Sequence, residues 1–178
     1  MRNTLFGLAM ALAVGGVGTV ASAQTDERRE AAAIVRDVAG QQIGVVTFTG
    51  QGGKLLVHAQ LTGLTEGFNG FHVHAVGECV DNFTSAGGHL NPAGSARHPG
   101  HYGDMPSLLA NADGTAELLF VSDRLRMADM FDADGSAVIV HADTDNYGNI
   151  PTRYIAEPDA TTYGTGDAGA RIACGVIQ

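Results

Sequence analysis

From residue 31 onward, the chain alternates between short apolar runs and turns rich in glycine. The clearest run is Lys54–Leu61, in which every second residue from Leu55 to Leu61 is apolar. Because successive side chains of a strand point to opposite faces, this alternation predicts a half-buried β-strand. Similar runs rich in apolar and β-branched residues lie at Ala31–Val38, Ile43–Thr49, Phe71–Ala75, Thr115–Val121, Ala137–Ala142 and Arg171–Ile177. The pattern predicts seven or eight strands in an antiparallel sandwich or barrel.

Two long segments, Gly77–Leu109 and Asp143–Gly169, separate the predicted strands. Both are too long and too rich in glycine for simple hairpin turns, and long loops in a compact domain are usually functional. Between them, Arg124–Phe131 is compatible with a helical turn or with an irregular connection between sheets. We find neither an internal repeat nor an interdomain linker, so we expect residues 31–178 to form a single domain.

The first 23 residues have the pattern of a secretory signal peptide. Arg2 and the amino terminus supply positive charge, an uncharged apolar stretch follows, and Ala21–Ala23 fits the small-residue rule for cleavage. We expect cleavage after Ala23 and a flexible leader over residues 24–30. The alternative is an uncleaved membrane anchor, which the glycines of the apolar stretch disfavour. Export predicts a periplasmic or secreted protein with no stable membrane association after cleavage, in a compartment that permits disulfides.

The charge and composition narrow the function further. A formal net charge of −9 over 178 residues argues against a nucleic-acid partner, which would require a basic stripe, and against docking on anionic lipid. The chain has seven histidines and a single lysine, Lys54, which indicates that histidine serves chemistry rather than charge. The two cysteines suffice for one disulfide bridge.

Six of the seven histidines lie in or beside the two long segments. His72 and His74 are two residues apart in a predicted strand, so their side chains point to the same face. The others are His89 after two glycines, His98 and His101 at steps of three with Asp104, and His141 at a strand end. Six imidazoles and one carboxylate are too many for one structural zinc and suit two adjacent metal ions, although a histidine-rich loop without a fixed metal is the alternative. The seventh, His58, lies on the more polar face of its strand, and we expect no metal role for it.

Four stretches of the chain resemble motifs of the copper/zinc superoxide dismutases, and the stretches HPGHYGDMPSL and DTDNYGNIPTRY resemble the bacterial exported members in particular. The four stretches are GLTEGFNGFHVH (Gly63–His74), SAGGHLNP (Ser85–Pro92), HPGHYGD (His98–Asp104) and GDAGARIACGVI (Gly166–Ile177). With the strands between them, the resemblance extends from about Ala31 to the end of the chain. It implies an all-β fold, an eight-stranded antiparallel Greek-key barrel or sandwich with two long functional loops.

The resemblance also implies two metal sites that share one ligand. The residues that match the copper ligands are His72, His74, His89 and His141. The residues that match the zinc ligands are His89, His98, His101 and Asp104. Asp145 matches a carboxylate that links a copper histidine to a zinc histidine, here His72 and His98, and such outer hydrogen bonds orient metal ligands. Cys79 and Cys174 match a disulfide that ties a loop to the last strand.

The implied activity is the dismutation of superoxide to oxygen and hydrogen peroxide, with one copper and one zinc ion per subunit. His89 would bridge the metals and carry a proton to the product, and Arg171 matches the arginine at the mouth of the copper channel. The chain departs from the eukaryotic members in one respect, because the segment Asp159–Gly164 before TGDAG contains no lysine. The attraction of the superoxide anion must therefore be arranged differently.

Two other readings of the chain compete with this one. A metal carrier of the cell envelope would need the ligands, but neither a channel arginine nor a bridging histidine. An adhesion or binding module of the sandwich type, with an incidental metal, would need no open copper position. The sequence leaves the oligomeric state open, and a homodimer is one option.

Overall fold

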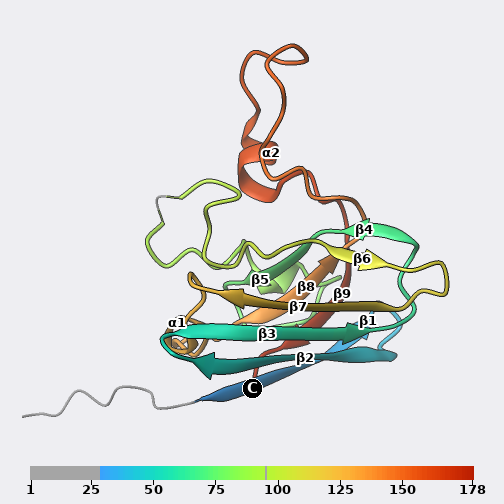
Figure 1. Ribbon diagram of the computed structural model, residues 1–178, viewed down its shortest axis with the longest axis vertical. Helices are drawn as coiled ribbons and strands as arrows, with labels where there is room; N and C mark the ends of the chain where they lie inside the picture. Colours follow the sequence, from blue (N-terminus) through green and yellow to red (C-terminus); the bar gives the residue numbers. More distant parts are fainter. Residues whose placement is uncertain (1–28, 95) are drawn as a thin grey trace, which may run out of the picture.

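The computed structural model describes residues 29–94 and 96–178, which form a curled antiparallel barrel (Figure 1). The expected signal peptide over residues 1–23 and most of the leader over 24–30 lie outside the described residues. The strands are β1 (Glu30–Asp37), β2 (Gln42–Gln51), β3 (Lys54–Leu61), β4 (Gly67–Asn69), β5 (Phe71–His74), β6 (Leu108–Ala110), β7 (Ala116–Ser122), β8 (Ala137–His141) and β9 (Arg171–Val176). The helices are the 3₁₀ turn η1 (Thr84–Ala86), α1 (Met127–Met130) and α2 (Ala160–Thr165).

Seven of the strands form one antiparallel sheet in the order β5-β8-β9-β1-β2-β3-β7. The last strand, β9, therefore lies beside the first, β1, as a Greek-key connection requires. The short strands β4 and β6 pair separately. Because β4 leads directly into β5 and β6 is followed by β7, this pair joins the two edges of the large sheet (Figure 1).

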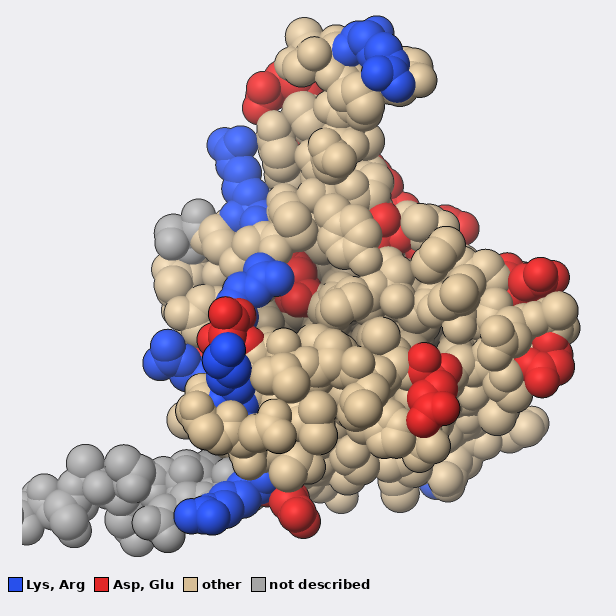
Figure 2. Space-filling model, in the orientation of Figure 1, with Lys and Arg blue, Asp and Glu red and all other residues tan. Residues whose placement is uncertain are grey.

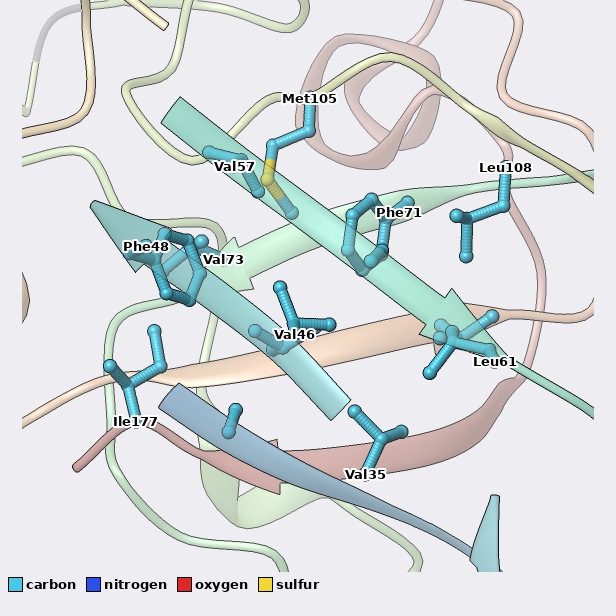
Figure 3. Close-up of a cluster of buried hydrophobic side chains, with 14 of the residues drawn as sticks. Val35, Val46, Phe48, Val57, Leu61, Phe71, Val73, Met105, Leu108 and Ile177 are labelled. Carbon is cyan, nitrogen blue, oxygen red and sulfur yellow. The ribbon is translucent and has the colours of Figure 1, made fainter. Parts of the chain in front are cut away.

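The core fills the barrel interior with the inward residues of alternating strands. In β3 the buried residues are Leu55, Val57, Ala59 and Leu61, as the alternation predicts. Figure 3 shows their neighbours from other elements, including Phe48, Phe71 and Met105, which are 0–2% exposed. Gly44 allows β2 to approach β3 closely, because a Cβ at this position would overlap the carbonyl oxygen of Gln60.

Strands β5 and β8 differ from the others because all their residues are buried. Their inner side chains, such as Phe71 and Val140, join the core, while the long loops cover their outer side chains. A second apolar cluster packs Phe83 of the first loop against Ile139 of β8 and Cys174 of β9. The structure also has the Cys79–Cys174 disulfide, which attaches the same loop to β9.

The fold confirms the all-β barrel and most of the predicted strands. We did not predict β4 and β6, because strands of three residues are too short to display an alternation. Of the two alternatives for Arg124–Phe131, the structure has the helical turn, α1, whereas α2 was not predicted. Asp159 caps α2, since its carboxylate accepts hydrogen bonds from the backbone N–H groups of Thr161 and Thr162. Within the described part of the chain, no helix has the length and apolar character needed to cross a membrane.

The disulfide should contribute a large share of the stability of the barrel, because it closes a loop of 95 positions. Replacing Cys79 and Cys174 together by serine is expected to lower the free energy of unfolding by about 2–5 kcal/mol, as measured by urea denaturation. The control is the wild-type protein, whose cysteines should resist alkylation when it is denatured without reductant. Equal urea midpoints for the two proteins, or two alkylated cysteines in the unreduced wild type, would contradict the expectation.

Candidate metal centre

The site begins with the alternation of side chains along β5. Phe71 and Val73 point into the core, so His72 and His74 point to the outer face of the strand, beneath the loops. The adjacent strand β8 ends at His141, which adds a third imidazole at the same end of the sheet. His89 comes from the first long loop, which runs beside β5 through an isolated bridge between His74 and His89. All four imidazoles are buried.

These four histidines form a compact set of nitrogen ligands. One ring nitrogen of each of His72, His74, His89 and His141 lies within 4.8 Å of the corresponding nitrogens of the others. The rings of His72 and His89 are nearest, with centroids 4.0 Å apart. The structure therefore brings together the four residues that match the copper ligands.

Hydrogen bonds from the outer ring nitrogens determine which nitrogens face the centre. Nδ1–H of His74 donates to the carbonyl oxygen of Gly87 at 2.9 Å, and Nδ1–H of His141 donates to that of Gly169 at 3.1 Å. Because a neutral imidazole carries one proton, each of these bonds leaves Nε2 with a free lone pair directed into the site.

Asp145 orients two further histidines by accepting hydrogen bonds from their outer ring nitrogens. Its Oδ2 accepts from Nε2 of His72 at 2.8 Å, and its Oδ1 accepts from Nε2 of His98 at 2.7 Å. Nδ1 of His72 thereby points into the site, and Nδ1 of His98 points toward Oδ1 of Asp104, 3.0 Å away. Gly166 makes room for this carboxylate, because a Cβ at this position would overlap Asp145 and the ring of His98.

Buried nitrogen atoms without a hydrogen-bond partner mark the centre. Among the described residues these are Nδ1 of His72 and of His98 and Nε2 of His74, His89 and His141. Burying a polar atom without a partner is unfavourable, so such a group of facing lone pairs is suited to bind a cation.

A second set of ligands surrounds one oxygen of Asp104. Its Oδ1 lies 2.7 Å from Nδ1 of His89, 3.0 Å from Nδ1 of His98 and 3.3 Å from Nδ1 of His101. His89 therefore belongs to both sets, with Nδ1 facing Asp104 and Nε2 facing the first set. The tightest grouping around Asp104 contains His72 with His89 and His98, whereas His101 lies at its margin.

Burial lowers the pKa of three imidazoles of the first set. It lowers the pKa of His89 to about 4 and that of His141 to about 3, and repulsion from the neighbouring His72 adds to both shifts. Burial also lowers the pKa of His74 well below its usual value, with repulsion from His89 as the next cause. These three imidazoles are neutral at pH 7, as metal binding requires.

The carboxylates have the opposite influence on the second set. Burial disfavours the charged form of His98, but the carboxylates of Asp104 and Asp145, 3.0 Å from Nδ1 and 2.7 Å from Nε2, outweigh this and raise its pKa to about 9. Burial would raise the pKa of both aspartates, yet their bonds to the histidines lower it well below the usual range. This part of the site therefore holds fixed negative charge, which favours a divalent cation.

Arg171 lies at the opening of the first set. A surface cleft is lined by Arg171 together with His74, His89 and His141, and one wall of it belongs to α2. The guanidinium donates to the carbonyl oxygens of Phe83 and Gly87, at 2.5 and 2.6 Å, which fixes its position. Because Gly87 also accepts from His74, one loop carbonyl orients both the cation and a ligand.

The remaining histidine, His58, lies outside both ligand sets, as its place on the polar face of its strand predicts. His58 lies on the outer face of β3, where its Nε2 is 2.8 Å from Oε1 of Glu117, and it belongs to neither set. The sequence did not predict that the carbonyl oxygens of Gly87 and Gly169 accept hydrogen bonds from His74 and His141. Their only sequence signal was the glycine-rich character of the loops.

Comparisons with known proteins give the same family as the motifs. The family model described as copper/zinc superoxide dismutase matches residues 42–177. A copper/zinc superoxide dismutase of Mycobacterium tuberculosis is 39% identical over 158 residues, which cover 78% of this chain and 65% of that protein. One of Legionella pneumophila is 36% identical over 141 residues, covering 76% of this chain and 78% of the relative. The chain thus spans about two thirds of the length of the mycobacterial relative.

Solved structures with a similar fold also point to this family. The clock protein EA4 superposes with a TM-score of 0.70 at 31% identity, covering 84% of this chain and 93% of that one. A superoxide dismutase-like protein from Bacillus subtilis gives a TM-score of 0.67 at 26% identity, covering 82% and 96%. The matched family motifs lie on the strands and loops that carry the two ligand sets, and the chain therefore belongs to the copper/zinc superoxide dismutase family.

Proposed function

We propose that the protein dismutes superoxide to oxygen and hydrogen peroxide at a copper ion that His89 bridges to a structural zinc ion. The observation that carries the proposal is the double membership of His89, whose two ring nitrogens face different ligand sets. Nε2 of His89 faces the first set and has no hydrogen-bond partner among the described residues. Nδ1 lies 2.7 Å from Oδ1 of Asp104, the oxygen around which the second set gathers.

The donor atoms fit the two metals. His72, His74, His89 and His141 offer four imidazole nitrogens, which suit copper. His89, His98, His101 and Asp104 offer three imidazoles and a carboxylate, a combination that suits tetrahedral zinc. Copper, when bound, supplies the one-electron oxidation and reduction of superoxide, whereas zinc has no redox chemistry.

His89 is the residue proposed to handle the proton. Its Nε2 faces the first set and the cleft and has no hydrogen-bond partner among the described residues. A nitrogen in this position can accept a proton and present it to peroxide formed in the cleft. Asp104 holds the ring in place meanwhile, because its Oδ1 lies 2.7 Å from Nδ1 of His89.

Arg171 is proposed to attract the anionic substrate. The protein has a formal charge of −9, so the molecule as a whole repels superoxide. On the face shown in Figure 2, acidic residues lie mostly on the right, whereas Lys and Arg gather on the left and at the tip of the projecting loop. Arg171 places a fixed positive charge beside His74, His89 and His141. A local positive field in a narrow cleft can overcome the repulsion at longer range. This arrangement needs no lysine in the segment Asp159–Gly164.

The cellular location follows from the proposed signal peptide over residues 1–23, with cleavage after Ala23. We infer an exported protein, periplasmic or secreted, with one domain over residues 31–178 and no stable association with a membrane. The Cys79–Cys174 disulfide supports an oxidising compartment. An extracellular superoxide dismutase of Onchocerca volvulus, 37% identical over 157 residues, is a relative with such a location. A homodimer is compatible with this proposal.

The activity is tested by loading the mature protein with copper and zinc, counting the metals per chain and measuring the loss of superoxide. We expect one copper and one zinc ion per chain and catalytic turnover. His89→Ala should abolish turnover, because it removes the shared ligand, whereas His58→Ala should keep both metals and the activity. Two bound metals without turnover would support a metal carrier instead, and the absence of stoichiometric copper would support a binding module.

The role of Arg171 is tested by reversing its charge. Arg171→Glu should lower the second-order rate constant at low ionic strength by about tenfold or more while both metals remain bound. The matched control is Arg153→Glu, which changes the same charge at an exposed position outside the cleft and should have little effect. An unchanged rate for Arg171→Glu with both metals bound, or an equal decrease for both variants, would reject this role.

A further inference from the structure

The second long loop leaves the metal centre at Asp145 and projects away from the barrel before it returns through α2 (Figure 1). Tyr147 follows Asp145 by two residues in this loop. Its backbone has a φ of 57°, in the left-handed region that a residue with a large side chain rarely adopts without other interactions to hold it. Some feature of the surroundings must therefore stabilise this conformation.

The backbone of Tyr147 contributes directly to the hydrogen bonds of Asp145. Its N–H donates to Oδ1 of Asp145 at 2.7 Å, the same oxygen that accepts from Nε2 of His98. Gly148 follows, and a side chain there would contact the carbonyl oxygen of His98. The turn at Tyr147 thus packs closely around Asp145 and around His98 of the second ligand set.

The side chain of Tyr147 attaches this turn to the barrel. Its hydroxyl oxygen accepts from the backbone N–H of Ser107 at 2.8 Å and lies 2.8 Å from Oγ of the same residue. Ser107 directly precedes β6, so the phenol connects the loop to the strand that helps to close the barrel. The aromatic ring lies nearly parallel to that of His98, with an angle of 13° and centroids 6.2 Å apart.

We propose that Tyr147 is a positioning residue for the proposed zinc site, which aims Nδ1 of His98 by holding Asp145 in place. This inference rests on the proposed function, because it takes the set around Asp104 as the zinc site. Without the bonds to Ser107, the backbone would relax from its positive φ and the N–H bond to Asp145 would be lost. Asp145 would then orient His98 less firmly, and zinc would bind more weakly.

The test measures the zinc affinity of metal-free protein by competition with a chromogenic chelator. Tyr147→Phe removes only the hydroxyl and should weaken zinc binding about 3-fold to 10-fold, whereas Tyr147→Ala also removes the ring and should weaken it about 10-fold to 100-fold. Ser107→Ala keeps the backbone N–H of Ser107, so its effect should be smaller than that of Tyr147→Phe. Cobalt(II) bound in place of zinc should show a changed visible spectrum in both Tyr147 variants.

The matched controls are Tyr154→Phe and Tyr154→Ala in the same loop. Tyr154 is 73% exposed and stacks on Arg153, so these changes should leave the zinc affinity and the cobalt spectrum as in the wild type. Urea midpoints of all variants show whether an effect follows stability alone. If Tyr147→Ala fails to fold, the comparison of Tyr147→Phe with Tyr154→Phe carries the test.

A wild-type zinc affinity and cobalt spectrum in both Tyr147 variants would overturn the inference. So would equal weakening by the Tyr147 and Tyr154 changes, since that would indicate a general effect of the loop on stability. The two failures can be told apart, because wild-type protein that binds no zinc would reject the proposed function itself. Weakened zinc binding that is specific to Tyr147, with an altered cobalt spectrum, would establish the positioning role.

Discussion

The structure depends on one constraint, which is the burial of six imidazoles so close together that five of their nitrogens have no hydrogen-bond partner within the described chain. Desolvation of polar nitrogens is unfavourable, and burial together with repulsion between neighbouring rings lowers the pKa of His74, His89 and His141. Cations that accept these lone pairs remove the penalty. The bonds of the outer nitrogens to Gly87, Gly169 and Asp145 follow from the same constraint, because they direct the free lone pairs inward.

The barrel provides the rigidity that this arrangement requires. Along β5 the period of two places Phe71 and Val73 in the core and His72 and His74 in the site, so core packing holds two ligands at a set separation. The loop that carries His89 is attached by the disulfide and by its own apolar cluster. The other loop is attached through Asp145. Stability and ligand geometry are therefore properties of the same contacts, since each attachment of a loop also positions a ligand.

Much of this could be predicted from the sequence, and the exceptions have physical reasons. Alternation identified the long strands, because burial of one face follows the period of a strand. The pair β4–β6 escaped detection, since three residues carry no period. The backbone carbonyls that orient His74 and His141 belong to glycines, and which carbonyl faces a ring depends on loop conformation rather than on residue type. The disulfide could be predicted because the family resemblance implies it and the two cysteines of the chain permit only one pairing. The marginal place of His101 in the second set is a matter of distances that no motif specifies.

The central claim is that two different metals occupy two adjacent sites that share His89. The most direct measurement is a crystal structure of the metal-loaded protein with anomalous diffraction data on both sides of the copper and zinc absorption edges. The account predicts a copper peak among His72, His74, His89 and His141. It also predicts a separate zinc peak among His89, His98, His101 and Asp104. A single position with signal at both edges, or a zinc ion bound by His72 in place of His101, would contradict it.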